Sequence, residues 1–191
     1  MSAASFGLSG YALWVAQFNH GRLKMTQPTL LCLRRELTPP IPKIPKIFLR
    51  TLLFTTGNKG TVIQSMFLRV HHPGGTFTFD FWGHTEGGKL TLGSGLFVGP
   101  TGVACDHHFN PRRGSDDFLF LDGQYRIEVF AADIRRSKPE LPMELNFTVD
   151  AQQAAELIQI TDTELFLLWN ADSCIYEGRV ERGRPRLDFP V

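Results

Sequence analysis

The stretch Thr76-Phe-Thr-Phe-Asp-Phe81 decides the fold class, because three phenylalanines alternate there with three polar residues. Successive side chains of a β-strand point to opposite faces of a sheet, so a period of two gathers the phenylalanines on one apolar face. An amphipathic helix would instead repeat its apolar residues three and four positions apart. The stretch therefore predicts a half-buried strand of an antiparallel sheet.

The same alternation recurs on both sides of this stretch, with Gly, Pro, Asn and Asp between the runs as turn residues. Asp150 is placed to cap a short helix over Ala151–Ile158. The remaining predicted strands are Tyr11–Phe18, Arg22–Met25, Leu30–Arg34, Lys46–Thr55, Thr61–His71, Leu90–Val98, Phe118–Leu121, Tyr125–Ala131, Met143–Val149 and a last hairpin of Glu164–Trp169 with Cys174–Val180. Many short strands with one helix predict an all-β antiparallel sandwich, either immunoglobulin-like or jelly-roll-like.

The pattern divides the chain into three parts. Residues 1–45 hold short strands and a Pro-rich connector, whose prolines favour an extended path, and we expect them to pack on the sandwich. Residues 46–150 carry the regular alternation and form the predicted core of the sandwich. Residues 151–191 contain the short helix, the last hairpin and an Arg-rich tail.

Composition bounds the partners and the compartment. The chain of 191 residues has 20 basic and 19 acidic side chains, a net charge of +1, which favours a protein partner over nucleic acid. Three widely spaced cysteines without a CxxC motif predict reduced thiols. The N-terminus lacks the basic region of a signal peptide, and no apolar run reaches membrane-spanning length. We therefore expect a cytoplasmic protein without a membrane span.

Two stretches carry a family resemblance. Asp122-Gly-Gln-Tyr-Arg-Ile-Glu-Val129, followed by Leu145-Asn-Phe-Thr-Val149, resembles the final two strands of an immunoglobulin-like or fibronectin-like sandwich. The chain lacks the Cys and Trp spacing of antibody domains, which excludes that subgroup. The overall order of strands, Pro-rich connector and Gly-x-Tyr strand also resembles small uncharacterised bacterial β-sandwich proteins. The resemblance implies a fold and no known activity.

The stretch Gly99–Asp117 contains the residues best suited to binding. It is rich in Gly, Asp, His and Arg and is predicted to be the longest irregular segment, so we expect it to form a recognition loop. The candidate binding residues in it are His107, His108, Arg112 and Arg113.

Metal ligation is a second possibility for the same region. The candidate ligands are His72, His84, Cys105, Asp106 and His108. On an extended strand Cys105 shares a face with His107, and Asp106 with His108, so each face supplies half a site. A third ligand would have to come from His72 or His84. No motif for a nucleotide or other cofactor is present, and we expect none.

Three hypotheses about function follow. The leading one is a non-catalytic binding or assembly module with an unknown partner, because no catalytic motif is present and sandwiches expose loops and edge strands. The first alternative is a metal-dependent enzyme on a jelly-roll-like barrel. The second is a nucleic-acid or phosphate binder that uses the arginine clusters, namely Arg112 and Arg113 with Arg179, Arg182, Arg184 and Arg186. Catalysis is left open, with a non-catalytic role favoured.

Overall fold

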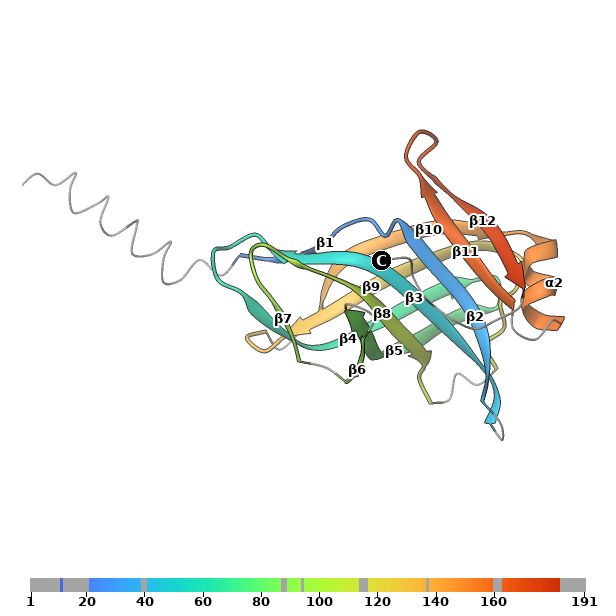
Figure 1. Ribbon diagram of the computed structural model, residues 1–191, viewed down its shortest axis with the longest axis horizontal. Helices are drawn as coiled ribbons and strands as arrows, with labels where there is room; N and C mark the ends of the chain where they lie inside the picture. The colour runs from blue at the N-terminus through green and yellow to red at the C-terminus, as the bar shows by residue number, and fades with distance from the viewer. Residues whose placement is uncertain are drawn as a thin grey trace, which may run out of the picture.

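A computed structural model of the chain describes residue 11 and residues 21–38, 41–86, 89–93, 95–113, 117–136, 138–159 and 163–182. Most of the predicted strand Tyr11–Phe18 and most of the Arg-rich tail lie outside these residues. The described residues form one antiparallel sheet and a short helix, α2 (Ala151–Gln159) (Figure 1). The strands are β1 Leu23–Met25, β2 Leu30–Thr38, β3 Ile41–Thr55, β4 Thr61–His72, β5 Gly75–Glu86, β6 Lys89–Leu92, β7 Leu96–Val98, β8 Val103–Pro111, β9 Gly123–Asp133, β10 Glu140–Val149, β11 Thr163–Asn170 and β12 Ile175–Arg182.

The sheet curls until its two ends approach each other. Its main path runs β10-β9-β4-β5-β8-β3-β2-β11-β12, while β1 pairs with β3, β6 with β5 and β7 with β4. At the ends of the path, β10 lies beside both β1 and β12 (Figure 1). The all-β antiparallel prediction with one short helix is therefore confirmed, and the sheet adopts a nearly closed, barrel-like form.

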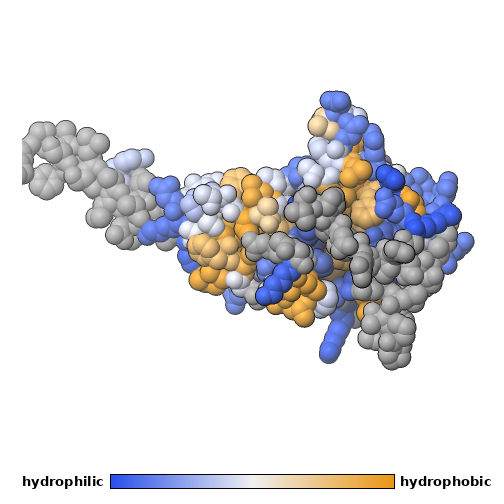
Figure 2. Space-filling model, viewed as in Figure 1, coloured by the Kyte–Doolittle hydropathy of each residue, from blue (hydrophilic) through white to orange (hydrophobic). Residues whose placement is uncertain are grey.

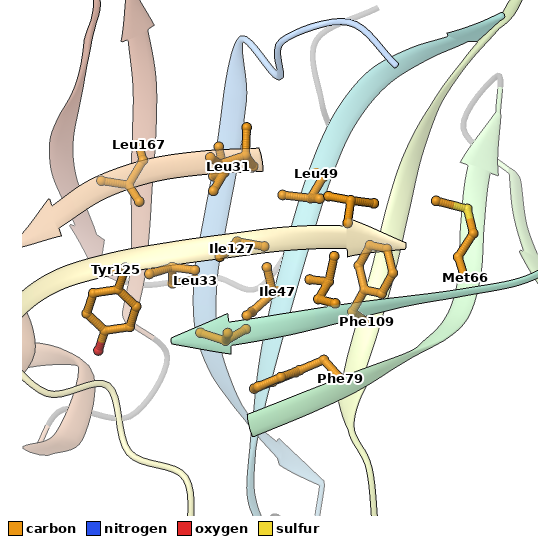
Figure 3. Close-up of a cluster of buried hydrophobic side chains, with 14 of the residues drawn as sticks. Leu31, Leu33, Ile47, Leu49, Met66, Phe79, Phe109, Tyr125, Ile127 and Leu167 are labelled. Carbon is orange, nitrogen blue, oxygen red and sulfur yellow. The ribbon is translucent and has the colours of Figure 1, made fainter. Parts of the chain in front are cut away.

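The inner face of the curled sheet holds the hydrophobic core (Figure 3). Phe79, the middle phenylalanine of the Thr76–Phe81 stretch, is fully buried, as are Leu68 and Ile127 on β4 and β9. On β9 and β10 the predicted alternation is confirmed, because the odd-numbered apolar residues 125–129 and 145–149 all lie inside. Removing this apolar surface from water is the main favourable contribution to folding.

The C-terminal predictions also agree with the structure. The backbone N–H of Gln153 donates to Asp150 Oδ1 at 2.8 Å, and the backbone N–H of Asp150 donates to Gln153 Oε1 at 3.1 Å. This reciprocal cap fixes the start of α2. The last predicted hairpin is β11 with β12, and β11 pairs on its other side with β2.

The predicted recognition loop is wrong in its central part. Gly99–Asp117 contains β8, which is hydrogen-bonded to β3 on one side and to β5 on the other. Residues 105–109 of β8 are buried on both faces, so they show no alternation of apolar and polar residues. Because the buried residues include Asp and His, the segment has the composition of a loop. The predicted strand Leu90–Val98 is instead two strands, separated by glycines with φ of +92° and +99°.

The Pro-rich segment is the end of a hairpin rather than a connector. β2 continues to Thr38 and β3 begins at Ile41, and the two strands pair beyond Pro45, which lies opposite Arg35. The pairing of β3 with β8 begins only at Ile47. Prolines 42 and 45 therefore lie where β3 has no partner among the described strands on its second side, and a missing N–H is tolerated there.

The sheet also continues across the predicted boundaries between the three parts of the chain, at residues 45 and 150. The β2–β3 hairpin spans the first boundary, and β11 returns to pair with β2 after the second.

Candidate functional site on strand β8

Strand β8 places the Cys105–His108 segment in the middle of the sheet. His107 lies opposite Leu49 of β3 and His84 of β5. Since Leu49 belongs to the core, Cys105 and His107 face inward, and Asp106 and His108 face outward. The segment thus supplies two chemically different clusters, one on each face.

The inner cluster is a buried hydrogen-bonded group. Cys105 Sγ lies 3.6 Å from Nε2 and 3.7 Å from Nδ1 of His107. His107 Nε2 also lies 3.1 Å from Thr51 Oγ1. The His107 side chain is 0 % exposed, and His84 is buried beside it, its Nδ1 lacking a hydrogen-bond partner. Solvent and substrates therefore do not reach this group in the folded protein.

Burial determines the protonation state of the inner cluster. Burial, together with smaller contributions from the neighbouring His84 and His108, lowers the pKa of His107 to about 3. At neutral pH His107 is therefore uncharged, so it supplies no imidazolium to stabilise a Cys105 thiolate. The arrangement is that of a neutral polar group built into the core rather than a cysteine–histidine catalytic pair.

The outer cluster consists of the His108 ring packed on Phe48 and of the Asp106 carboxylate beside Arg50. His108 Nε2 lies 3.0 Å from Thr85 Oγ1, and its ring meets the Phe48 ring edge-on with centroids 4.7 Å apart. The Asp106 carboxylate lies 3.7 Å from Arg50 Nε. Burial raises the pKa of Asp106, while Arg50 opposes that shift.

His72 is the last residue of β4 and lies beside the start of β5, whereas His84 lies near the far end of β5. The Cα partner of His72 is Gly75, nine residues before His84, a separation of about 30 Å along the strand. The His72 ring stacks on Tyr125 at 5.3 Å, and its Nδ1 accepts from the backbone N–H of Gly74 at 3.2 Å. Burial among aromatic rings lowers the pKa of His72. His72 therefore belongs to an aromatic cluster and does not approach β8.

The structure does not assemble the candidate metal ligands into a site. Over the described ranges, which include all five candidates, no three His, Cys, Asp or Glu side chains converge in a way that could hold a metal ion. Alternation explains the result, because it separates Cys105 from Asp106 and His108 across the thickness of the sheet. We therefore propose no metal centre.

The arginine candidates are engaged by carboxylates. Arg112 makes a bidentate pair with Asp80, with Nε to Oδ2 at 2.9 Å and Nη2 to Oδ1 at 2.6 Å. Arg182 pairs with Glu156 at 3.1 Å, and Arg179 lies 3.4 Å from Glu181. Arg113 is exposed, whereas Arg184 and Arg186 lie outside the described residues. These pairs reduce the positive charge that a phosphate backbone would meet.

An exposed apolar surface was not expected from the sequence. Leu90 and Leu92 of β6 are 42 % and 61 % exposed, and Phe97 of β7 is 63 % exposed. We call these three residues the edge surface. They point outward, because Thr91 lies opposite the inward His84, and Leu96 and Val98 on either side of Phe97 are buried. Figure 2 shows hydrophobic surface where Figure 1 places β6 and β7.

One signal in the sequence could have revealed the edge surface. Gly93 and Gly95 interrupt the apolar run and divide it into the two short strands β6 and β7. Two further exposed apolar residues lie around the edge surface. Trp82 lies beside β6, and Ile134 lies near β7, where its backbone N–H donates to the Val62 carbonyl at 3.2 Å.

Comparisons with known proteins found no relative of this chain. No protein-family model, no curated protein and no solved structure matches the chain. The fold and site thus define an antiparallel all-β protein with one short helix. Within the described part of the chain, the structure contains no helix with the length and apolar character needed to cross a bilayer.

Proposed function

We propose that this protein is a non-catalytic assembly module that associates with a second copy of itself through the edge surface. One observation carries the proposal: large apolar side chains stand exposed on strands that end the hydrogen-bonding of the sheet. Exposed apolar patches on soluble domains commonly mark interaction sites.

The backbone of the edge surface is available for pairing as well. Among the described strands, β6 pairs only with β5, and β7 pairs only with β4. Natural sheets usually protect such edges with charges, prolines or bulges, because a free edge recruits other chains. β6 carries one charged residue, Lys89 at its start, and from Leu90 to Val98 there is no charged residue and no proline. Both side chains and backbone thus favour strand addition.

A second copy is the partner that this sequence suits. The run Leu90-Thr-Leu92 is symmetric about Thr91. Two antiparallel copies related by a two-fold axis would set Leu90 of one opposite Leu92 of the other. A net charge of +1 also leaves little repulsion between copies.

The finer fold type is also a proposal. Tyr125 donates its hydroxyl to the Leu121 carbonyl at 2.7 Å, and Tyr125 lies opposite Phe147 in the β9–β10 pair. A tyrosine bonded to the backbone a few residues upstream is a feature of immunoglobulin-like sandwiches. This contact supports an immunoglobulin-like arrangement of β9 and β10. Self-association through β6 and β7 does not depend on it.

Sedimentation velocity over a wide range of concentration tests the proposed function. We expect the native chain to form a dimer that dissociates on dilution, and Leu92→Lys to remain monomeric throughout, because a buried lysine opposes an apolar contact. Leu168→Lys is the matched control, since Leu168 is also an exposed strand leucine, on β11. A native chain that stays monomeric at the highest concentration, or a Leu92→Lys variant that still dimerises, contradicts the proposal.

A further inference from the structure

A cleft of about 300 Å³ lies on the seam of the sheet, between β1 and the start of β10 (Figure 1). Among the described strands, β1 pairs only with β3 and β10 pairs only with β9, so no hydrogen-bonded ladder joins the two strands across the cleft. The volume falls at the lower end of the range for small-molecule sites. We call this space the β1–β10 cleft.

A β-bulge in β10 keeps the cleft from closing. The register of β10 with β9 shifts between Glu140 and Met143, so that Leu141 and Pro142 together oppose the single residue Phe130. Such bulges end strand pairing and redirect side chains at the rims of barrels. Pro142 also lacks the N–H that a neighbouring strand would accept. Both features oppose the pairing of β10 with β1 at this point.

Two cations line the cleft from the β1 side. Lys24 lies between the buried residues Leu23 and Met25, so its side chain points out of the core. Arg22 is also exposed, and its backbone is bonded to Thr56 in both directions. The Arg22 N–H donates to Thr56 Oγ1 at 2.8 Å, and the Arg22 carbonyl accepts from the Thr56 N–H at 3.0 Å. The two cations therefore stand on a fixed backbone.

The opposite wall of the cleft contains a neutral ion pair. Arg136 pairs with Glu140, and its Nη2 donates to the Gly21 carbonyl at 3.2 Å. These contacts hold the turn between β9 and β10 against the residue that precedes Arg22. Within the described part of the chain, no carboxylate pairs with Arg22 or Lys24. The lining of the cleft thus has two uncompensated positive charges, although the whole chain has a net charge of only +1.

The other cleft on the seam has the opposite charge. It has a volume of about 370 Å³ and is lined by Asp150, Glu156 and Arg182, among others. Arg182 pairs with Glu156 at 3.1 Å, which leaves the Asp150 carboxylate as the excess charge. An anion is therefore attracted to the β1–β10 cleft and repelled from this one.

We propose that the β1–β10 cleft binds a phosphate monoester that carries an apolar substituent. A phosphate monoester has a charge of about −1.5 to −2 near neutral pH, which matches Arg22 and Lys24. Leu141, which is 48 % exposed, and Pro142 line the cleft as well and provide an apolar wall for the substituent. The cleft shares no residue with the edge surface, so the proposal is independent of self-association.

Titration calorimetry of the full chain at low ionic strength tests the proposal, with phenyl phosphate and inorganic phosphate as probes. We expect phenyl phosphate to saturate one site and to bind roughly fivefold more tightly than inorganic phosphate, because the ring covers apolar surface. Arg22→Gln and Lys24→Gln should each weaken phenyl phosphate binding by about tenfold or more. Leu141→Ser should instead remove only the advantage of phenyl phosphate over inorganic phosphate.

Arg113→Gln is the matched control, because it removes the same charge from an exposed side chain that follows the far end of β8. Phenyl phosphate should bind this variant with native affinity. The midpoint of unfolding should be native in Arg22→Gln and Lys24→Gln, since neither side chain has an ion-pair partner among the described residues. A loss of affinity in Arg113→Gln equal to that in Lys24→Gln would show attraction by net charge alone and overturn the proposal.

Vesicles distinguish the two sources of such a ligand. Phosphatidic acid presents a phosphate monoester on an apolar chain, so the native chain is sedimented with phosphatidylcholine vesicles that contain or lack it. Retention that depends on phosphatidic acid and is lost in Lys24→Gln assigns the ligand to a lipid headgroup. Binding of phenyl phosphate without retention on vesicles assigns it to a free phosphorylated compound. Binding to neither probe, or retention that both Arg22→Gln and Lys24→Gln leave unchanged, contradicts the proposal.

Discussion

At the residue scale, His107 shows how a chemically versatile side chain becomes part of a core. It is fully buried, and its hydrogen-bonding partners are Thr51 and the Cys105 sulfur. Desolvation penalises the charged imidazolium, so the folded protein holds the imidazole neutral. The unfolded chain has no such restriction, and the difference between the two states makes stability depend on pH.

The stability of the fold should therefore decrease in acid. The folded pKa of His107, about 3, lies below the ordinary value of 6.5, so between these values the unfolded state binds one more proton. The contribution is complete above pH 6.5 and is lost as pH falls toward 3. Denaturant unfolding of His107→Gln should show a slope of unfolding free energy against pH that is lower by up to about 1.4 kcal/mol per pH unit.

Thr51→Val separates titration from hydrogen bonding in that experiment. It removes the hydroxyl that meets His107 but keeps the imidazole, so its stability falls at every pH while the steep slope remains. A His107→Gln variant with the native slope would show that other groups cause the acid sensitivity.

At the scale of elements, β8 is the central strand that ties the two halves of the sheet together. It hydrogen-bonds to β3 and β5 and is buried on both faces from Cys105 to Phe109. A segment in this position cannot be deleted without opening the sheet. The deletion tolerance that a recognition loop would have does not apply to it.

Phe109 offers a direct measure of that role. It is fully buried beside Phe81, so Phe109→Ala should lower the free energy of unfolding by about 3–5 kcal/mol. Phe97→Ala is the same change on an exposed strand residue and should cost within about 0.5 kcal/mol when measured on the monomer. Equal losses for the two variants would contradict the central placement of β8.

The elements differ in how readily the sequence predicts them. β5, β9 and β10 each have one core face, so their alternation identified them. β8 has no solvent face, so alternation is absent and its histidines favoured a loop. Alternation on an extended strand places Cys105 with His107 on one face and Asp106 with His108 on the other, but which pair faces the core depends on the register with β3 and β5.

At the scale of the whole molecule, the curled sheet has a seam between β10 and its neighbours β1 and β12. β10 pairs only with β9, and β12 only with β11, among the described strands. Two clefts lie on this seam. One of about 370 Å³ is lined by α2 and β12, and one of about 300 Å³ by residues 22–24 and residues around Glu140.

Hydrogen exchange should report the seam. Amides of β8, which is bonded on both sides, should exchange only on global unfolding. Amides of β10 that point away from β9, and amides of β12 that point away from β11, should exchange through local opening. Mass spectrometry of exchange at neutral pH measures the order. Protection of β10 and β12 equal to that of β8 would instead indicate a fully closed barrel.

The sequence by itself determined the fold class, the antiparallel strands with one buried face, the capped helix and the last hairpin. Each of these depends on local pattern, on side-chain alternation or on turn and cap chemistry within a few residues. The tertiary structure alone decided the burial of β8, the exposure of Leu92 and Phe97, and the burial of Cys32 on β2 and Phe48 on β3. These depend on which strands become neighbours, and the pairing of residues far apart in the chain leaves no periodic signal in either partner.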